Sequence, residues 1–248
     1  MHKFFVTEEN IKNGYISITG EDVQHITKVL RLRQKDEIKV CSSGKEYICD
    51  ISEILKNEII CKINESFPNN SEANIEITLF QGIPKAQKMD LIIQKCVEIG
   101  VVSIIPVITQ RVIVKIEDRD ISTKIERWRR ISAEAAKQSN RGIIPKICDP
   151  ISFDSSIQHL RDMDLAIIPY ENEKHYGLKN ILKTKFNIKK IGIFIGPEGG
   201  FDTTEIDKCL INNVHPVTLG PRILRTETAG FVAATIILYE LGDMGGII

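Results

Sequence analysis

The feature that most constrains the fold is a change of pattern near residue 70. Before it, short runs rich in β-branched and aromatic residues are separated by turn formers such as Asn13-Gly14 and Ser43-Gly44. This pattern is typical of a small β-barrel or rolled sheet, interrupted by one helix at 21–30. The predicted strands are 3–6, 15–18, 37–41, 45–54 and 58–63. The polar stretch 67–73 then predicts a linker.

After the linker, predicted strands alternate with predicted helices, which indicates an α/β domain with a largely parallel sheet. The stretch 87–99 places its apolar residues on one helical stripe, and 121–139 is a longer helix with a basic flank. The predicted strands are 75–80, 102–108, 165–168, 191–195 and 214–219. A chain of 248 residues is long enough for two cores, so we expect domains at 1–70 and 74–248.

Charge gives a local rather than a global signal. The chain carries 33 basic and 33 acidic residues, so net charge alone indicates no polyanionic partner. The segment 109–146, however, contains ten Lys or Arg against five Asp or Glu. It is therefore a candidate nucleic-acid face, and a solvated helix face of mixed charge is the alternative.

Cysteine spacing and hydropathy exclude several classes of protein. The six cysteines include no C-x-x-C pair, so we expect reduced structural thiols and no metal site. The N-terminal sequence has acidic residues where a signal peptide needs an apolar run, and the longest apolar stretch, 229–241, is too short to span a bilayer. We expect a cytoplasmic protein that does not enter a membrane.

The strongest local motif is Gly196-Pro-Glu-Gly-Gly-Phe201, which directly follows the predicted strand 191–195. Its glycines permit positive φ and close approach of the backbone, so peptide N–H groups could turn toward a ligand. Asp202 and Glu205 then resemble a capping box that begins the next helix. A tight strand-to-helix turn with no ligand would use the same residues.

A second motif, Leu219-Gly-Pro-Arg-Ile-Leu-Arg-Thr-Glu-Thr-Ala229, follows the next predicted strand. It leads into an apolar helix at 231–241, with Thr226 or its neighbour as the expected N-cap. Two arginines and a glutamate crowd one turn beside the first glycine-rich loop, which favours a binding site. An exposed ion-pair network of little energetic value is the alternative.

The third motif is the basic helix around Glu126-Arg-Trp-Arg-Arg130. Helical spacing places charged residues near one face, where guanidinium groups could meet phosphates or a base edge. These residues are Arg127, Arg130, Glu134, Lys137 and Arg141. Trp128, the one tryptophan, is expected in the core.

Taken in order, HITKVLRLRQKDEIKV, KMDLIIQKCVEIGV, ERWRRISAEAAKQSNR, IGPEGGF and LGPRILRTETA resemble the RsmE family of 16S rRNA uridine-N3 methyltransferases. The resemblance implies an N-terminal PUA-like β-barrel that binds RNA and a C-terminal α/β SPOUT domain with a trefoil knot. It also implies S-adenosylmethionine as cofactor, the small ribosomal subunit as partner, and a homodimer. Lys35, Ala86 and Val112 depart from the residues usual in that family.

The resemblance places the cofactor against the two glycine-rich loops. The implied cofactor-binding residues are Ile195, Gly196, Pro197, Gly199, Gly200, Leu219, Gly220, Ile223 and Leu224. Methylation at uridine N3 requires loss of a proton and stabilisation of the resulting anion. The candidate catalytic residues are Arg141, Arg225, Glu198 and Glu227, the carboxylates acting as a base or holding an arginine. Expected RNA contacts are Lys28, Arg31, Arg33, Arg127, Arg130 and Arg222.

Two other functions remain compatible with these residues. An ordinary open-sheet domain could bind a different nucleotide, in which case NAD or ATP would protect the protein against heat and S-adenosylhomocysteine would not. A non-enzymatic RNA-binding or assembly protein could keep a vestigial pocket, although the intact GPEGG and RILRTE segments weigh against it.

Overall fold

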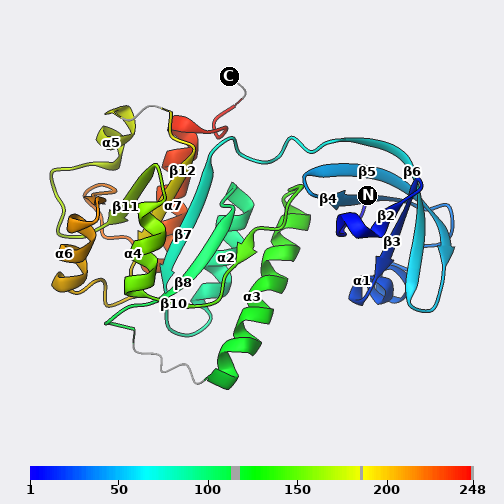
Figure 1. The fold of residues 1–248 in the computed structure, drawn as a ribbon, viewed down its shortest axis with the longest axis horizontal. Helices are drawn as coiled ribbons and strands as arrows, with labels where there is room; N and C mark the ends of the chain where they lie inside the picture. The colour runs from blue at the N-terminus through cyan, green and yellow to red at the C-terminus, as the bar shows by residue number, and fades with distance from the viewer. Residues whose placement is uncertain (113–117, 185–186, 247–248) are drawn as a thin grey trace. The chain divides into compact units, whose positions relative to one another are not determined.

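The computed structural model describes residues 1–112, 118–184 and 187–246 (Figure 1). It divides the chain into two compact units. Unit 1 comprises Met1–Glu72 together with Ala136–Ile143, and unit 2 comprises Ala73–Ala135 with Ile144–Ile248. The segment Ala136–Ile143 thus belongs with the N-terminal residues, which no sequence pattern indicates. The division at 1–70 and 74–248 stays a prediction about the functional domains.

Unit 1 is built on a six-stranded sheet in the order β1-β4-β5-β6-β3-β2. Neighbouring strands are antiparallel, except that β1 is parallel to β4. One face buries a core of Phe4, Ile16, Ile38, Ile51 and their neighbours. The strands are β1 (Lys3–Phe5), β2 (Ile11–Lys12), β3 (Tyr15–Thr19), β4 (Glu37–Ser42), β5 (Lys45–Ile54) and β6 (Glu58–Pro68). The predicted strands are therefore confirmed, and β2 was missed because two residues give no period.

The helix predicted at 21–30 is found as two short pieces. An α-helical turn, α1 (Glu21–Gln24), continues directly into a π-helical turn, η2 (His25–Val29). A separate 3-10 turn, η1 (Glu8–Asn10), lies between β1 and β2. Leu30 N–H donates to His25 O at 2.9 Å, the wider spacing of a π turn. The chain then turns at Arg31, whose φ is 55°.

Lys35 and Ala86, which depart from the residues usual in the family, both have left-handed backbone conformations. Their φ angles are 72° and 55°, a region that glycine adopts without strain. A side chain there costs about 1–2 kcal/mol. The loops therefore keep a shape that suits glycine, although this chain places other residues at both positions.

Unit 2 contains a seven-stranded parallel sheet in the order β10-β8-β7-β12-β11-β13, with β9 paired to β8. The strands are β7 (Glu76–Gly82), β8 (Ser103–Ile108), β9 (Lys146–Ile147), β10 (Ile151–Ser152), β11 (Leu165–Pro169), β12 (Lys190–Ile195) and β13 (Val214–Val217). The helices are α2 (Lys88–Ile99), α3 (Asp118–Gln138), α4 (Phe153–Arg161), α5 (Leu178–Thr184), α6 (Thr203–Ile211) and α7 (Thr226–Leu241). The alternation read from the sequence is thus confirmed, although β9, β10, α4 and α5 were not predicted.

Both faces of this sheet are buried, as parallel sheets require. The core on one face joins Phe80 and Phe194 of the strands to Phe153 of α4 and Ile206 of α6. On the other face, α7 approaches so closely that a Cβ added at Gly230 would lie 3.1 Å from a Leu79 methyl. Among the described residues, no helix is both long and apolar enough to cross a membrane.

The strand order brings three loops to one edge of the sheet. β12, β11 and β13 are consecutive neighbours and all parallel, so their carboxyl ends lie side by side. The loops after them are residues 170–177, 196–202 and 218–225. Ligands of open parallel sheets bind at this edge.

Candidate functional site

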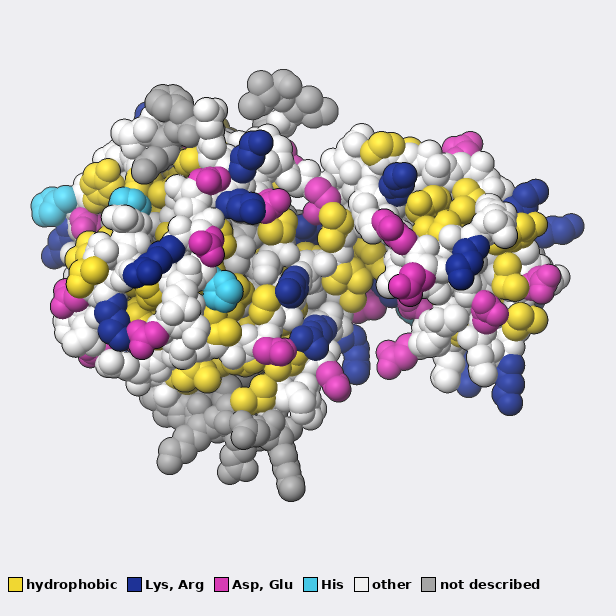
Figure 2. Space-filling model, viewed as in Figure 1, with side chains coloured by type: hydrophobic (Ala, Val, Ile, Leu, Met, Phe, Trp, Pro, Cys, Tyr) yellow, Lys and Arg dark blue, Asp and Glu magenta, His cyan; other side chains and the backbone are white. Residues whose placement is uncertain are grey.

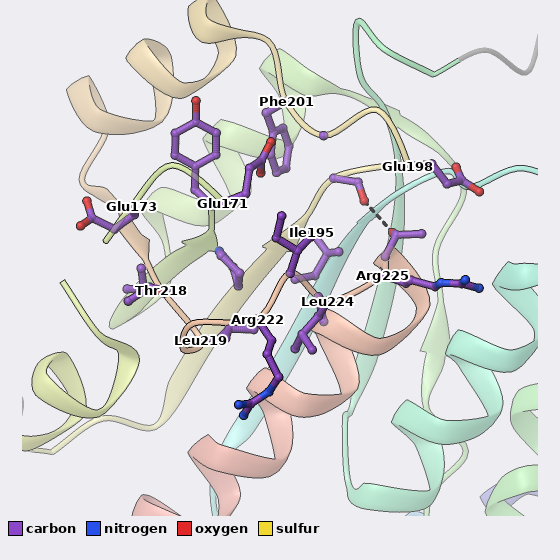
Figure 3. A pocket seen from close by; sticks show the side chains of 18 of the residues that line it. Glu171, Glu173, Ile195, Glu198, Phe201, Thr218, Leu219, Arg222, Leu224 and Arg225 are labelled. Carbon is purple, nitrogen blue, oxygen red and sulfur yellow. Dashed lines mark hydrogen bonds between the residues drawn. The ribbon is translucent and has the colours of Figure 1, made fainter. Parts of the chain in front are cut away.

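A cavity of about 1030 Å³ opens at the carboxyl ends of β11, β12 and β13 (Figure 3). Its walls are the three loops, the first turn of α7, and Lys88 at the start of α2. The structure places all nine residues expected to bind a cofactor around this one cavity. They are Ile195, Gly196, Pro197, Gly199, Gly200, Leu219, Gly220, Ile223 and Leu224. Their role in binding a cofactor stays a prediction.

The first glycine-rich loop is fixed at both ends. Gly200 has a φ of 65°, and its N–H donates to Pro197 O at 2.9 Å, which closes a tight turn. The Asp202 side chain then caps α6, and the Glu205 carboxylate accepts a hydrogen bond from the Asp202 N–H. The predicted capping box is therefore confirmed. Arg111 donates to Gly199 O at 3.0 Å and pairs with Asp202. The sequence did not indicate that Arg111 holds this loop.

The second loop is joined to the first by Thr226. Helix α7 begins at Thr226 with Arg225 as N-cap, so the N-cap expected at Thr226 or its neighbour is confirmed, and the helix includes the apolar stretch 231–241. The buried Thr226 hydroxyl donates to Gly196 O at 2.6 Å and accepts from Gln81 Nε2 at 2.9 Å. The end of β7, the loop after β12 and the start of α7 therefore share one chain of hydrogen bonds.

Two of the four candidate catalytic residues meet at Lys88, which sequence reasoning did not single out. Lys88 Nζ lies 2.8 Å from Glu198 Oε1 and 3.5 Å from Glu227 Oε2. The backbone N–H of Lys85 also donates to both Glu198 oxygens, at 3.1 and 3.2 Å. Burial alone would raise the pKa of the Glu198 carboxyl, but these hydrogen bonds outweigh it and lower the pKa. The bond to Glu198 in turn raises the pKa of Lys88.

Glu227 is less completely bonded than Glu198. Its Oε2 is buried, and its nearest cation is Lys88 Nζ at 3.5 Å, which is longer than an ordinary hydrogen bond. Its Oε1 lies 3.9 Å from Nη1 of Arg225, the third candidate catalytic residue. The Arg225 side chain is 83% exposed, so it can move toward a ligand. Arg222 and Ile223 also line the cavity and are exposed.

The loop after β11 supplies a wall that the sequence did not indicate. Tyr170, Glu171, Glu173 and Lys174 line the cavity. Glu171 and Glu173 lie on one side of it, and Glu198 and Arg225 lie on the other (Figure 3). Glu173 accepts two backbone N–H groups, from His175 and Tyr176, and these lower the pKa of its carboxyl. The cavity therefore carries carboxylates on both sides, and Lys88 and Arg225 lie on the side of Glu198.

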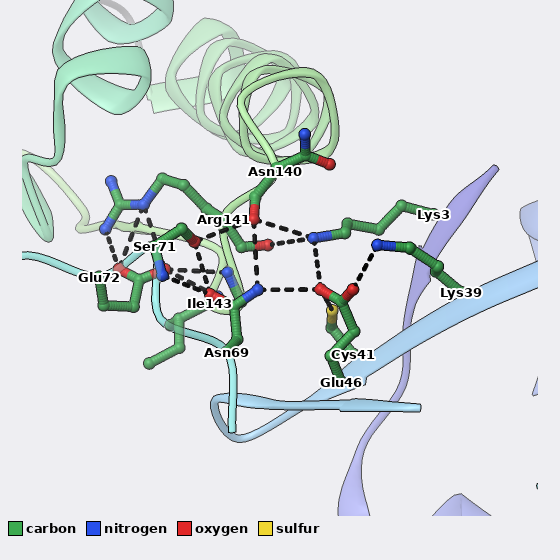
Figure 4. Close-up of polar contacts among 11 residues, drawn as sticks. Lys3, Lys39, Cys41, Glu46, Asn69, Ser71, Glu72, Asn140, Arg141 and Ile143 are labelled. Atoms are coloured by element: carbon green, nitrogen blue, oxygen red, sulfur yellow. Dashed lines mark hydrogen bonds and ion pairs between the residues drawn. The ribbon is translucent and has the colours of Figure 1, made fainter. Parts of the chain in front are cut away.

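The fourth candidate, Arg141, does not line this cavity. It is 2% exposed and lies within unit 1, where its Nη2 is 2.5 Å from Glu72 Oε2 (Figure 4). Glu72 Oε1 also accepts the N–H groups of Gly142 and Ile143. The contacts around Arg141 are those of a structural ion pair, and its catalytic role stays a prediction.

The predicted RNA contacts are dispersed over both units. Lys28, Arg31 and Arg33 are exposed at and after the η2 turn of unit 1. In α3 of unit 2, Arg130 is exposed and Arg127 is paired with Asp90. Trp128 is buried, as expected. On the face drawn in Figure 2, Lys and Arg side chains alternate with Asp and Glu, in keeping with the zero net charge. Positions 113–117 of the basic segment lie outside the described residues.

The cysteines behave as structural thiols. All six are free, and only Cys148 is not fully buried. Burial raises the pKa to about 12 for Cys49, Cys61, Cys96 and Cys209. Thiols that stay protonated are poor nucleophiles and poor metal ligands. Within the described ranges, no group of His, Cys, Asp and Glu side chains could hold a metal ion.

Comparison with known proteins matches two successive parts of the chain to family models. Residues 71–238 match the family model of an RNA methyltransferase domain, and residues 18–64 match that of an RNA methyltransferase PUA domain. Ribosomal RNA small subunit methyltransferase E of Bacillus subtilis is 35% identical, over 97% of each chain. The same-named protein of Aquifex aeolicus is 33% identical, over 96% of this chain and 99% of its own.

Two solved structures share the whole fold. The methyltransferase Lpg2936 of Legionella pneumophila, in complex with the bound cofactor SAM, has a TM-score of 0.87 and 28% identity over 98% of each chain. Ribosomal RNA small subunit methyltransferase E of Neisseria gonorrhoeae, bound to S-adenosyl methionine, has a TM-score of 0.85 and 29% identity. The alignment covers 98% of this chain and 99% of that one.

A PUA sheet joined to a parallel sheet with two glycine-rich loops at its carboxyl edge defines an RNA methyltransferase of the SPOUT class. The fold class predicted from the sequence is thereby confirmed. Within that class, the chain belongs to the ribosomal RNA small subunit methyltransferase E (RsmE) family, because the identity extends over nearly its whole length.

Proposed function

We propose that this chain uses S-adenosylmethionine to methylate N3 of one uridine in the 16S rRNA of the small ribosomal subunit. The observation that carries the proposal is the cavity that both glycine-rich loops line. The related small-subunit ribosomal RNA methyltransferases, and the related structures with bound S-adenosylmethionine, support it. Ribosomes assemble in the bacterial cytoplasm, so the proposed function places the chain there.

The residues present fit this cofactor. The cavity is large enough for a nucleoside, and Ile195, Leu219 and Leu224 give it apolar walls beside exposed peptide groups. A Cβ at Gly220 would meet no atom within 4 Å, so glycine leaves open space at the lining. When bound, S-adenosylmethionine supplies an already activated methyl group, and the protein has to align the acceptor and remove its proton.

We assign the roles in the cavity by position. The nine loop residues named above would hold the cofactor, and Glu198, Arg225 and Glu227 would face the target base. Arg141 is too deeply buried in unit 1 to belong to this cavity, so its predicted role would require another site. Lys28, Arg31, Arg33, Arg127, Arg130 and Arg222 would contact RNA. We further propose a homodimer, which the family resemblance implies.

Calorimetry with S-adenosylmethionine, NAD and ATP tests the cofactor assignment, and mass spectrometry of ribosomal RNA from cells lacking the protein tests the product. We expect binding of S-adenosylmethionine alone, and loss of one N3-methyluridine. Binding of NAD or ATP instead would support the alternative of an ordinary open-sheet domain that binds a different nucleotide. Absence of any cofactor binding, with RNA binding retained, would support an assembly protein.

Thr226→Val is expected to weaken cofactor binding about tenfold. The change keeps the side-chain shape but leaves Gly196 O and Gln81 Nε2 without this partner, and an unsatisfied buried polar group costs about 1–3 kcal/mol. Thr226→Ser retains the hydroxyl and should stay within threefold of the wild type. Calorimetric titration with S-adenosylhomocysteine measures both, and equal weakening in the two variants would remove the hydroxyl from the explanation.

Replacing Lys28, Arg31 and Arg33 with glutamine is expected to reduce the salt dependence of RNA binding. Each phosphate contact that is lost should lower the slope of log K against log salt by about 0.7–0.9, so the triple variant loses about 2–3. Filter binding to small-subunit particles between low and moderate salt measures the slope. Lys56→Gln, an exposed position in the β5–β6 turn, is the control, and an equal loss there would argue against a specific contact.

A further inference from the structure

Three charged side chains form one end of the cavity, one from the start of α2 and two from the start of α7. Lys88 begins α2, Glu227 lies in the first turn of α7, and Arg225 precedes that turn. Lys88 Nζ is 3.5 Å from Glu227 Oε2, and Arg225 Nη1 is 3.9 Å from Glu227 Oε1. The carboxylate is thus flanked by a donor on each side.

The position of Lys88 does not serve the helix that contains it. Lys88 is the first residue of α2, and a cation there faces the positive end of the helix dipole, which is unfavourable. Glu198 compensates for this: it accepts from Lys88 at 2.8 Å and is itself held by the Lys85 N–H. The Glu198 oxygens are thus occupied by Lys88 and by the Lys85 N–H, and the lowered pKa makes this carboxylate the weaker proton acceptor, so Glu198 acts as the anchor of Lys88.

Glu198 already accepts hydrogen bonds from protein donors, whereas Glu227 can still accept one from a ligand. Its Oε2 is buried with only the long Lys88 contact at 3.5 Å, and a buried acceptor without a hydrogen bond carries a free-energy cost. A ligand N–H that reached this carboxylate would remove that cost. The residues around Glu227 therefore favour a ligand whose donor group lies between two acceptors.

Uracil has that arrangement, because its N3–H lies between two carbonyl oxygens. We propose that Lys88, Glu227 and Arg225 form a donor–acceptor–donor array that recognises the Watson–Crick edge of the target uracil and removes its N3 proton. This inference rests on the proposed function, and it assigns Lys88 a catalytic role that the sequence did not reveal. Cytosine lacks the N3–H and presents an amino group instead, so it would leave the array unpaired.

The proton step balances within the array. The N3–H bond breaks, the proton passes to the Glu227 carboxylate, and the electron pair remains on N3, delocalised onto the two carbonyl oxygens. Lys88 and Arg225 donate to those oxygens and stabilise the negative charge. The pair on N3 is then the nucleophile for methylation. Glu198 takes no proton and keeps Lys88 beside Glu227.

The test compares small-subunit particles whose 16S rRNA contains either uridine or 5-fluorouridine, with S-adenosylmethionine at saturation. With uridine, Lys88→Met and Glu227→Gln should lower the single-turnover rate about 10²–10³-fold. Fluorine makes N3–H more acidic, so with 5-fluorouridine both deficits should shrink at least tenfold. Lys88→Arg keeps a donor and should stay within about tenfold of the wild type.

Two further measurements separate chemistry from structure. Each variant should bind S-adenosylhomocysteine within threefold of the wild type, which shows that the cavity has formed. At pH 8.5, the wild type loaded with S-adenosylhomocysteine should bind the 5-fluorouridine particles more tightly than the uridine particles, and Lys88→Met should lose that preference. Lys208→Met is the matched control, since it removes a lysine that pairs with Asp154 outside the cavity.

The outcomes are distinct. A wild type that does not methylate uracil N3 would refute the proposed function itself. A wild type that does so, while Lys88→Met equals Lys208→Met, would overturn the inference alone. The inference would also be overturned if the loss of single-turnover rate in the two variants were the same with 5-fluorouridine as with uridine, because a structural role does not depend on the acidity of the base.

Discussion

Replacing Glu46 with alanine is expected to destabilise the sheet of unit 1 by about 3–5 kcal/mol, because it leaves a buried ammonium unpaired. Lys3 Nζ lies 3.0 Å from Glu46 Oε2, and the two side chains are 4% and 5% exposed. Lys3 also donates to the carbonyl oxygens of Asn140 and Arg141 (Figure 4). Hydrogen–deuterium exchange of the β4 and β5 amides measures the loss.

The matched control replaces both charges together. Lys3→Met with Glu46→Leu removes the ion pair without leaving either charge unpaired, and such apolar replacements are often neutral. The double variant should therefore recover most of the stability that Glu46→Ala loses. If the single variant matched the wild type, or if the double variant were the less stable of the two, the cluster would not depend on charge pairing.

The same carboxyl gives the stability a defined pH dependence. Burial would raise the pKa of Glu46, but hydrogen bonds from Lys39, Lys3 and Asn69 outweigh it and lower the pKa to about 2, from 4.5. A group whose pKa is depressed by folding contributes its full stability above the unfolded value. The difference between wild type and Glu46→Ala should thus be constant above about pH 5 and shrink as the pH falls from 4.5 toward 2.

Arg141 shows what helical periodicity can and cannot predict. Arg127 and Arg130 lie in α3, but this helix ends at Gln138, so Arg141 lies beyond it and the predicted common helical face does not include Arg141. Periodicity also does not reveal which other part of the chain packs against a helix end. Here Glu72 and Lys3, distant in sequence, cover the segment Ala136–Ile143. Arg141, one of the candidate catalytic residues, is in fact 2% exposed.

The two glycine-rich loops of the cavity could be predicted from the sequence, but the rest of its wall could not. The two glycine-rich loops follow predicted strands, and parallel neighbours place such loops at one edge, so the residues around Gly200 and Gly220 could be grouped from sequence. The position of β11 between β12 and β13 could not be read, because strand order depends on long-range pairing. Glu171 and Glu173 were missed for that reason. Lys88 was missed because its partners, Glu198 and Glu227, are more than a hundred residues away.

Gly82→Ala is expected to lower kcat/KM for methylation about 10²-fold. A Cβ at Gly82 would lie 2.7 Å from both Cδ and N of Pro197, and these backbone and ring atoms cannot rotate away. The loop 196–200 would have to shift by about an ångström, which strains the Thr226 bond to Gly196 O, and displacements of that size cost about 10²-fold in rate.

Gly177→Ala is the matched control for this change, because a Cβ there meets no atom within 4 Å and its φ is ordinary. Gly177 follows β11 near the same edge of the sheet, so its variant tests whether any added methyl group disturbs the loops. Steady-state kinetics and titration with S-adenosylhomocysteine should show Gly177→Ala within threefold of the wild type and Gly82→Ala weakened in both. Wild-type behaviour of Gly82→Ala would mean that the first loop can leave β7 without losing its function, and the close approach of Pro197 would then be incidental to binding.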